Sequence, residues 1–234
     1  MASGARSPGS SPKRTLTVAI DGPAGAGKST VSKTVARALG YTLVDTGAIY
    51  RAVALLAQRR GVSWDDELGL EAVVRNLEID FRLDNGTNRV WVNGEEVTDV
   101  IRTPQMDQGA SKVSSHMRVR QGLLALQRRL AGRGGAVLEG RDIGTVVCPD
   151  AEVKVFLDAS VEERARRRFR ELEKRGETPG YEQVLADVRA RDSRDRQREH
   201  APLRIADDAV VLDCTQLTPQ QAARRVVELA QQAD

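Results

Sequence analysis

The sequence is poor in the residues that build metal sites and disulfide frameworks. It has two cysteines, Cys148 and Cys214, which lie far apart and form no C-x-x-C pair, and two well-separated histidines, His116 and His200. This composition argues against a zinc site, a disulfide framework and a histidine-based metal site. It is what we expect of a protein from a reducing compartment.

Long apolar runs and a strong net charge are also missing. No apolar run approaches the ~20 residues that a membrane-spanning helix needs, and the N-terminus lacks the apolar core of a signal peptide. The 36 Lys and Arg residues nearly balance the 33 Asp and Glu residues, which leaves a formal net charge of +3. This balance argues against wholesale nucleic-acid binding and favours local clusters of arginine. We therefore expect a soluble, cytoplasmic protein with no membrane or nucleic-acid partner.

The length sets the scale of the fold. A chain of 234 residues can bury a large core, and we expect one α/β unit with small appended lobes. Residues 1–14, MASGARSPGSSPKR, are rich in Ser, Gly, Pro and basic residues and cannot bury a core. We predict a disordered tail there, with a functional tail as the alternative. Nothing in the sequence demands more than a monomer.

The stretch TLTVAIDGPAGAGKST, at residues 15–30, organises the rest of the chain. Its apolar first part predicts a buried strand, and a match to G-x-x-x-x-G-K-[ST] follows, then a helix-like stretch that ends on Gly40. Strand, glycine loop and helix together are typical of a phosphate-binding loop (P-loop), in which backbone N–H groups and the helix dipole face a phosphate. The predicted contacts to a nucleoside triphosphate are Gly22, Pro23, Ala24, Gly25, Ala26, Gly27, Lys28, Ser29 and Thr30.

Two residues of this loop have distinct roles. Lys28 can reach the β- and γ-phosphates, and the Ser29 hydroxyl can hold Mg²⁺ directly or through water. The loop alone does not separate kinases, GTPases and ATP-driven machines. The base-specifying N-K-x-D of GTPases is absent, and the chain is too short for a P-loop core plus a large effector domain.

Further short apolar runs predict the rest of a sheet. They lie at residues 41–46, 136–139, 152–157 and 209–213, and they alternate with predicted helices. One helix is opened by a capping box at Ser160–Glu163, and the last by a capping box at Thr218–Gln221 with Pro219 at its first position. Five strands alternating with helices predict an α/β fold of the P-loop NTPase type, a five-stranded parallel sheet with helices on both faces.

Residues 62–104 change character. The segments 79–83 and 89–92 alternate apolar with polar residues around Asp84-Asn-Gly86, which predicts a hairpin. We predict a small antiparallel sheet in a lobe inserted into the core. Residues 105–131 return to helix, in two segments with a break near Ser115-His116.

Polar residues gather where ligands bind in such folds. Asp45, Thr46 and Arg51 follow the second strand, at the edge where open α/β sheets hold ligands, although DTGAIYR alone could be an ordinary strand-to-helix turn. The spacing of Arg191, Asp195 and Arg198 places the three on one helical face, and Arg164 and Arg168 stack in the same way. Each set alone could be a solvated, salt-bridged helix face. Together with the P-loop they favour an enzyme that brings two phosphates together, because several guanidinium groups can offset that charge.

Six blocks carry a resemblance to a known family. IDGPAGAGKST, DTGAIYR, SKVSSHMRVR, GRDIGTVV, VFLDASVEERARRR and RDSRDRQR, in this order and at these intervals, resemble the bacterial cytidylate kinase (CMP kinase) family over about residues 15–232. The resemblance implies a nucleoside monophosphate kinase fold, with a P-loop core at residues 15–49, 122–161 and 177–234, a monophosphate-binding lobe at 50–121 and a short helical lid at 162–176. It implies transfer of the ATP γ-phosphoryl group to CMP or dCMP with Mg²⁺, giving CDP or dCDP and ADP, in pyrimidine nucleotide metabolism.

The resemblance also implies residue roles. The acceptor phosphate would be met by Thr46, Arg51 and Arg141. The cytosine edge would be met by Ser111, Arg120 and Asp142, helped by Arg198. Arg191 and Asp195 would hold the sugar hydroxyls and assist at the phosphates, so that the catalytic set is Lys28, Arg141, Arg191 and Asp195. Arg164 and Arg168 belong to the part that resembles the lid and would contact ATP.

The implied pocket makes sense for cytosine. Asp142 and Ser111 suit the amino group of the base, and Arg120 suits its acceptors at N3 and O2. Uracil reverses the first two polarities, so we predict weak use of UMP. Two positions depart from or vary within the family pattern: Thr46 replaces the serine of DSGAIYR in many relatives, and members vary between Gly and Ser at the position of Ser29.

Two other functions stay open from the residues alone. One is a small P-loop kinase that acts on a different monophosphate or on a small metabolite. The other is a nucleotide-dependent RNA-binding or regulatory protein that uses the arginine run at residues 166–170. A salt-sensitive affinity for RNA without phosphoryl transfer would indicate the second.

Overall fold

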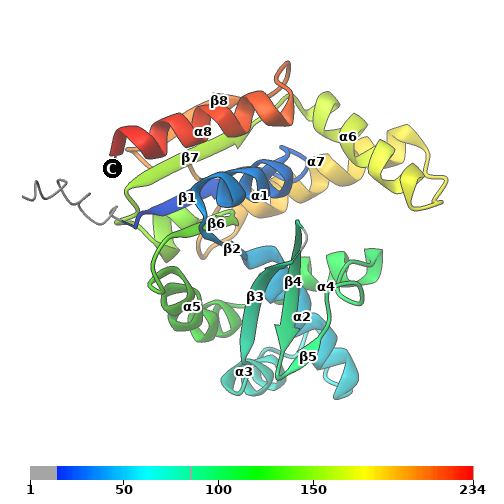
Figure 1. Ribbon diagram of the computed structural model, residues 1–234. Coiled ribbons are helices and arrows are strands. Elements are labelled where there is room, and N and C mark those ends of the chain that lie inside the picture. Colours follow the sequence, from blue (N-terminus) through cyan, green and yellow to red (C-terminus); the bar gives the residue numbers. More distant parts are fainter. Residues whose placement is uncertain (1–14, 85, 234) are drawn as a thin grey trace, which may run out of the picture.

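A parallel sheet of five strands forms the centre of the computed structural model, which describes residues 15–84 and 86–233 (Figure 1). The strand order is β2-β6-β1-β7-β8 and every neighbouring pair is parallel, as predicted. The strands are β1 (Thr17–Asp21), β2 (Thr42–Asp45), β6 (Ala136–Gly140), β7 (Val153–Asp158) and β8 (Val210–Asp213). The tail predicted at residues 1–14 lies outside the described residues, and so does Asn85 of the predicted hairpin turn.

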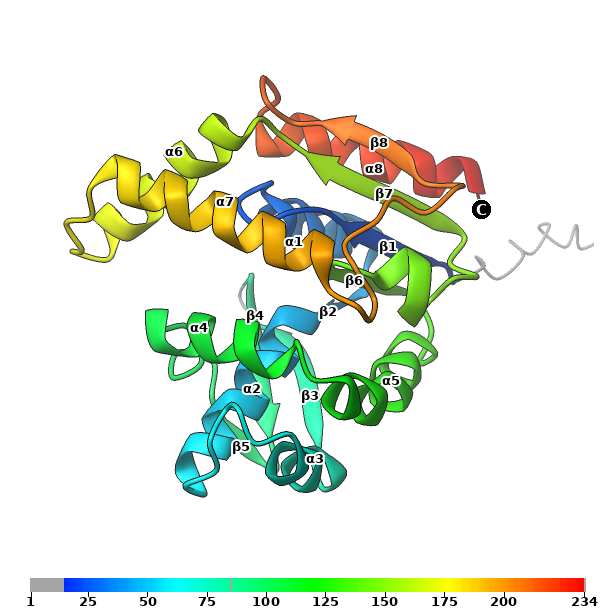
Figure 2. The same cartoon turned by 180° about the vertical axis from the view of Figure 1, so that it is seen from behind.

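Helices cover both faces of this sheet because its inner strands are apolar on both sides. Helices α1 (Lys28–Leu39) and α8 (Pro219–Ala233) pack on one face, where their side chains form one apolar cluster with Val18, Ile20 and Val155. On the other face, α5 (Met117–Ala131) and α2 (Thr46–Arg59) share a second cluster with Ala19 and Leu138. Helix α7 (Tyr181–Gln197) runs along this second face, as Figure 2 shows from behind.

The inserted lobe contains the predicted antiparallel sheet. Its strands β3 (Ile79–Asp84), β4 (Thr87–Val92) and β5 (Glu95–Glu96) pair in that order, and the helix break predicted near residue 115 separates α4 (Pro104–Val113) from α5. The apolar side chains of the lobe belong to the same cluster as the second face of the core. The sheet of the lobe also reaches the edge strand β2, because the Asn88 side-chain amide donates to the Leu43 carbonyl at 3.3 Å.

One helix of the lobe was not predicted. Helix α3 (Glu67–Arg75) begins after Asp66, whose carboxylate accepts the Gly69 N–H at 3.0 Å. Its buried residues, Leu70, Val73 and Val74, have helical spacing. The signal was therefore present in the sequence, next to a stronger signal for strands.

A helical hairpin projects beside the sheet. Helix α6 (Val161–Lys174) returns through residues 175–180 into α7, and a small apolar cluster of Ala165, Leu185 and Val188 holds the two helices together. In both views the hairpin faces α4 of the lobe (Figures 1 and 2). No helix in the described part of the chain is long and apolar enough to cross a membrane.

Two local predictions need correction. Ser160 does cap α6 by accepting the Glu163 N–H at 3.2 Å, but the Glu163 carboxylate pairs with Arg167 and the Ser160 N–H donates to Thr215. The capping box is therefore only half formed, because a nearby guanidinium competes for the carboxylate. Arg198 does not continue the face of Arg191 and Asp195, because α7 ends at Gln197 and the backbone of Arg198 is extended. The reciprocal capping box between Thr218 and Gln221 is confirmed.

Candidate active site

The glycine loop lies between β1 and α1, as its sequence predicts. Gly22 has a φ of 148° and a side chain there would lie 2.0 Å from the Leu157 carbonyl oxygen, so that only glycine fits against β7. Gly25 has a φ of 77°, and a side chain there would lie 2.9 Å from the Arg164 carbonyl oxygen of α6. The loop then enters α1 at Gly27, with Ser29 and Thr30 exposed on the first turn of the helix. This is the arrangement that presents backbone N–H groups to a phosphate.

Lys28 lies folded into this loop. Its ammonium donates to the carbonyls of Gly22 and Pro23, each at 2.8 Å. Burial, followed by the nearby charge of Arg141, lowers the pKa of Lys28 well below its usual value. A buried cation that is disfavoured by its neighbours is one that an anionic ligand would stabilise.

Arg191 is the clearest case of an uncompensated charge. It lies on α7, and its half-buried side chain forms no hydrogen bond or ion pair within residues 15–84 and 86–233. Burial and the neighbouring Arg141 lower the pKa of its guanidinium to about 10. Because these cations disfavour one another, the cluster of Arg191, Arg141 and Lys28 is suited to a strong anion.

One carboxylate partly balances this cluster. Asp195 accepts from Arg141 Nε at 2.8 Å. Burial would raise the pKa of Asp195, but Arg141 and then Arg191 outweigh that effect and lower it. Asp195 therefore stays ionised, and it holds Arg141 in place at the carboxyl end of β6. The structure thus brings together the four residues predicted as the catalytic set.

A second pair lies beside this cluster. Arg120 and Asp142 form a close ion pair, with only 9% and 8% of their side chains exposed. The guanidinium of Arg120 also lies 5.6 Å above the ring of Tyr50, and burial raises the pKa of the Tyr50 hydroxyl. Arg198 joins this group: burial and Arg120 lower its pKa, and its buried Nε and Nη2 have no partner among the described residues. These nitrogens are free to donate to a ligand.

The remaining predicted acceptor contacts lie on the lobe side. Thr46 is buried and its hydroxyl donates to the Glu139 carbonyl at 2.7 Å. Arg51 donates to Asp45 at 3.0 Å and to Asp107 at 3.4 Å. Burial would lower the pKa of Arg51, but these two carboxylates raise it. Its buried Nε has no partner in the part of the chain that the structure describes.

Ser111 is less engaged. It lies half-buried on α4, and its carbonyl accepts from the Ser114 hydroxyl at 3.2 Å. Its own hydroxyl has no hydrogen-bond partner within the described residues.

The two predicted lid arginines differ. Arg164 is 1% exposed and its guanidinium forms a bidentate pair with Asp192, at 2.9 and 2.6 Å. It also donates to the Ala24 carbonyl of the P-loop at 3.1 Å, so it stabilises the conformation of the loop. Arg168 is more exposed and pairs with Asp107 and Glu171, both at 2.9 Å.

Three residues of the site were not predicted from the sequence. Glu139 is the next-to-last residue of β6 and lies near Lys28. Burial, followed by the charge of Asp45, raises its pKa to about 7, although Lys28 and the Ser29 hydroxyl oppose this. Asp21 ends β1 and accepts the N–H groups of Ile143 and Gly144, each at 2.8 Å. The third is Tyr50, described above. The two carboxylates could have been predicted as site residues from their position, because each lies at or beside the carboxyl end of a buried strand.

Asp21 positions a loop of the site. It anchors η1 (Ile143–Val147), one turn of π-helix that directly follows Arg141 and Asp142. Such turns are rare in proteins, and those that occur are often found at functional sites. The turn holds the backbone after Asp142, and thereby orients Arg141 and Asp142.

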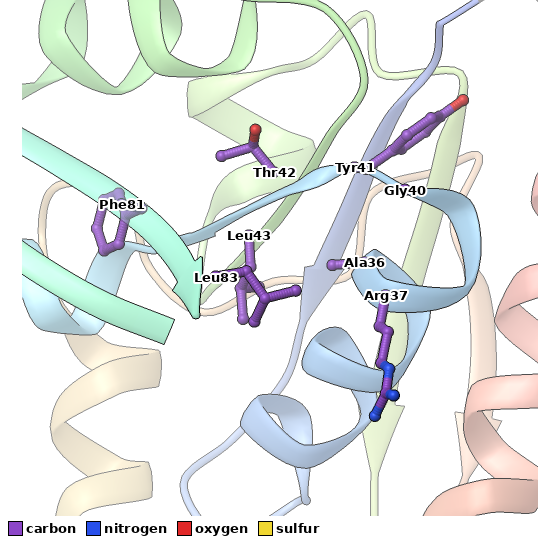
Figure 3. Close-up of a pocket in the computed structure, with 8 residues that line it drawn as sticks. All are labelled: Ala36, Arg37, Gly40, Tyr41, Thr42, Leu43, Phe81 and Leu83. Atoms are coloured by element: carbon purple, nitrogen blue, oxygen red, sulfur yellow. The ribbon is translucent and has the colours of Figure 1, made fainter. Parts of the chain in front are cut away.

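A pocket of about 280 Å³ lies away from these residues (Figure 3). It opens between the C-terminal end of α1, the start of β2 and strand β3. Its lining is Ala36, Arg37, Gly40, Tyr41, Thr42, Leu43, Phe81 and Leu83, none of which is a predicted site residue. It lies at the amino end of β2, the end opposite to the one where parallel sheets bind ligands.

Comparison with known proteins agrees with the geometry. The sequence pattern of the family described as cytidylate kinase matches residues 18–232. A cytidylate kinase of Citrifermentans bemidjiense is 55% identical over 204 residues, which is 87% of this chain and 88% of that protein. A cytidylate kinase of Geobacter sulfurreducens is 50% identical over 222 residues, 95% of both chains, and one of Caldicellulosiruptor bescii is 45% identical over 214 residues, 92% of this chain and 95% of the other.

Proposed function

Because the chain belongs to the cytidylate kinase family, it is a nucleotide kinase that phosphorylates CMP, and we propose which residues carry each part of the reaction. ATP binds along residues 22–30, and CMP or dCMP binds between α7, η1 and the lobe. The products are CDP or dCDP and ADP. The observation that supports this proposal is the guanidinium of Arg191, which has no hydrogen-bond or ion-pair partner among the described residues, beside Arg141 and Lys28.

Phosphoryl transfer needs no dedicated general base here, since the attacking group is an anionic phosphate oxygen of CMP. The protein must align two polyanions and offset the charge of the transferring group. Lys28 and Arg191 would contact the donor side of that group, while Arg141 and Arg51 would hold the acceptor phosphate with Thr46. The planar guanidinium groups of these three arginines can each bind phosphate oxygens through two parallel hydrogen bonds. Asp195 would accept from the sugar hydroxyls while it orients Arg141.

A Mg²⁺ ion bound with ATP would offset phosphate charge during the transfer. Ser29 would hold it directly or through water, and the Glu139 carboxylate is the second candidate. Both offer oxygen ligands of the kind that Mg²⁺ prefers. The raised pKa of about 7 at Glu139 supports the fit, because a buried carboxylate short of positive charge is a group that a cation would keep ionised.

Recognition of cytosine is proposed to rest on Asp142, Arg120 and Arg198, with Ser111. Asp142 would accept from the amino group, and the unpartnered nitrogens of Arg198 and the guanidinium of Arg120 would donate to N3 and O2. Uracil would present an oxygen to Asp142 and an N–H to a guanidinium. Sites of this type can discriminate by up to roughly 10⁴-fold or more, so we expect weak use of UMP.

We also propose that the enzyme works as a cytoplasmic monomer in pyrimidine nucleotide metabolism, and that its lobe and lid close around the substrates. The lid comprises residues 162–176 and the lobe residues 50–121. Closure would exclude water from the transferring group. Arg168 lies half-buried on α6 and would move with the lid toward ATP, whereas an ATP contact by Arg164 would require its pair with Asp192 to change.

The test is ADP production from Mg²⁺-ATP with CMP, dCMP, UMP, AMP and GMP in parallel, beside a control without acceptor. We expect activity mainly with CMP and dCMP. Comparable turnover of UMP would refute the proposed base contacts. Hydrolysis of ATP without dependence on an acceptor would contradict the kinase assignment. Tight, salt-sensitive RNA binding without phosphoryl transfer would favour the regulatory alternative.

A further inference from the structure

Asp107 lies where three arginines from different elements converge. It is in the first turn of α4, which Thr103 caps by accepting the Met106 N–H. One carboxylate oxygen accepts from Arg168 of α6 at 2.9 Å, and the other lies 3.4 Å from Arg51 of α2. Its charge also acts on Arg191 of α7, whose pKa it raises against the larger effect of burial. A single carboxylate thus faces guanidinium groups of the lobe, the lid and the core.

The contact with Arg168 joins the lobe to the lid hairpin. Asp107 belongs to the lobe and Arg168 to the lid hairpin, 61 residues apart, and both views show α4 facing that hairpin (Figures 1 and 2). The pair is partly shielded, with 18% of the Asp107 side chain and 27% of the Arg168 side chain exposed. A shielded pair loses less of its strength to solvent and salt than an exposed pair.

The pair is one link in a continuous chain of ion pairs. The chain runs from Asp45 at the end of β2 through Arg51 to Asp107, and then to Arg168 and Glu171 in the lid. Arg51 is proposed to hold the acceptor phosphate and Arg168 to contact ATP. Asp107 is therefore the only described carboxylate that pairs with both of these arginines.

We propose that Asp107 is a positioning residue that joins the acceptor lobe to the lid, so that the guanidinium of Arg51 and that of Arg168 are held in register for the two nucleotides. The bridge forms before any phosphate binds, since the carboxylate itself supplies the negative charge between the two arginines. It lowers the cost of bringing lid and lobe together when the substrates arrive. The role of the bridge in catalysis rests on the proposed function, whereas the bridge itself does not.

Two measurements on Asp107→Asn test this. Hydrogen–deuterium exchange of the full-length, nucleotide-free protein should show faster exchange in residues 161–174 of α6, by about two- to fivefold, although the substitution lies in α4. A merely local role of Asp107 at the N-terminal end of α4 would change exchange in α4 alone. In steady-state assays the KM for CMP should rise by a similar factor, about two- to fivefold, with a smaller change in kcat.

The matched control is Glu171→Gln. It also removes a partner of Arg168, but within α6, so it should leave the KM for CMP and exchange in α4 unchanged. Asp107→Glu keeps the charge with a longer side chain and should restore most of the protection of α6. Unchanged exchange of α6 in Asp107→Asn, an equal rise of KM in Glu171→Gln, or no recovery in Asp107→Glu would each overturn the proposal. Hydrogen exchange is measured without nucleotide, so it tests the bridge independently of the enzyme assay. If the assay with five acceptors gave no CMP kinase activity, the proposed function would fail, but the exchange of α6 would still test the bridge.

Discussion

Lys28 shows how function conflicts with stability at a single residue. Its ammonium is buried among Arg141 and Arg191 and its pKa is lowered, so its charged form weakens the ligand-free fold. In Lys28→Met we expect kcat to fall by about 10²- to 10³-fold, since one charge opposite the transferring group is lost. We expect the free energy of unfolding in urea to stay equal or to rise. A large loss of stability would instead make Lys28 a structural residue.

Asp142 should act on one substrate only. It pairs with Arg120 and is proposed to contact the base, so Asp142→Ala should lower kcat/KM for CMP by about 10- to 10²-fold and leave the affinity for ATP unchanged. Steady-state kinetics with each substrate varied in turn would measure this. Asp150→Ala, an exposed position shortly after η1, is the control and should behave as wild type. Equal damage to ATP binding would count against the role of Asp142 in contacting the base.

Asp21 predicts a pH dependence of stability. Burial raises its pKa from the ordinary 3.8 to about 6, more than the two N–H bonds lower it. The folded state therefore favours the protonated form, and the stability contributed by that form is present below about pH 4 and is lost as the pH rises through 6. The expected loss is about 3 kcal/mol, from 1.36 kcal/mol for each pKa unit between the folded and unfolded states.

The measurement compares wild type with Asp21→Asn, which cannot titrate. Urea unfolding at several pH values between 4 and 7 gives the difference in unfolding free energy between the two proteins. As the pH rises, the unfolding free energy of wild type should fall relative to that of Asp21→Asn. Other titrating groups contribute equally to both proteins and cancel in the comparison. A constant difference over that range would show that Asp21 ionises normally in the folded protein.

At the scale of elements, the buried pair of Arg164 and Asp192 joins α6 to α7, and Arg164 also donates to Ala24 of the P-loop. Removing one partner leaves a charge in a place that water cannot reach, which typically costs about 3–5 kcal/mol. We expect Asp192→Asn to destabilise the protein by about that amount in chemical denaturation. The control is Glu162→Gln, which removes the exposed pair with Arg189 between the same two helices. It should change stability by less than about 1 kcal/mol, and equal effects would contradict the special role of the buried pair.

Elements with a strong local pattern were predictable, and those decided by tertiary contacts were not. The first strand, the glycine loop and the reciprocal cap at Thr218 depend on residues close in sequence. The half-formed box at Ser160 depends on Thr215, 55 residues away in the sequence, which accepts the Ser160 N–H. Helix α3 had helical spacing, but its neighbouring strands carried the stronger pattern. The π-helical turn after Asp142 needs Asp21, more than 100 residues away.

At the scale of the molecule, the order of the strands explains why distant residues meet. Strands β2, β6 and β1 are consecutive in the sheet, so their carboxyl ends bring together Lys28, Arg51 and Arg141, each of which follows a different strand. The sequence predicted this edge as the site because polar residues follow apolar runs. It did not predict Glu139 and Asp107 as partners of the basic cluster, since their roles arise from which strands and helices become neighbours.

The same convergence predicts how ligands stabilise the whole protein. Lys28, Arg141 and Arg191 repel each other in the ligand-free fold, and bound phosphates would remove that cost. A ligand at 100 times its Kd stabilises the folded state by about 2.7 kcal/mol. At about 2–4 °C per kcal/mol for a chain of this size, a non-hydrolysable Mg²⁺-ATP analogue should raise the Tm by about 5–11 °C. Adding CMP should raise it further, whereas cytidine, which lacks the phosphate, should have little effect. If cytidine stabilised the protein as much as CMP, the arginines would not be acting on the acceptor phosphate, and the unpaired charge of Arg191 would need another anion to explain it.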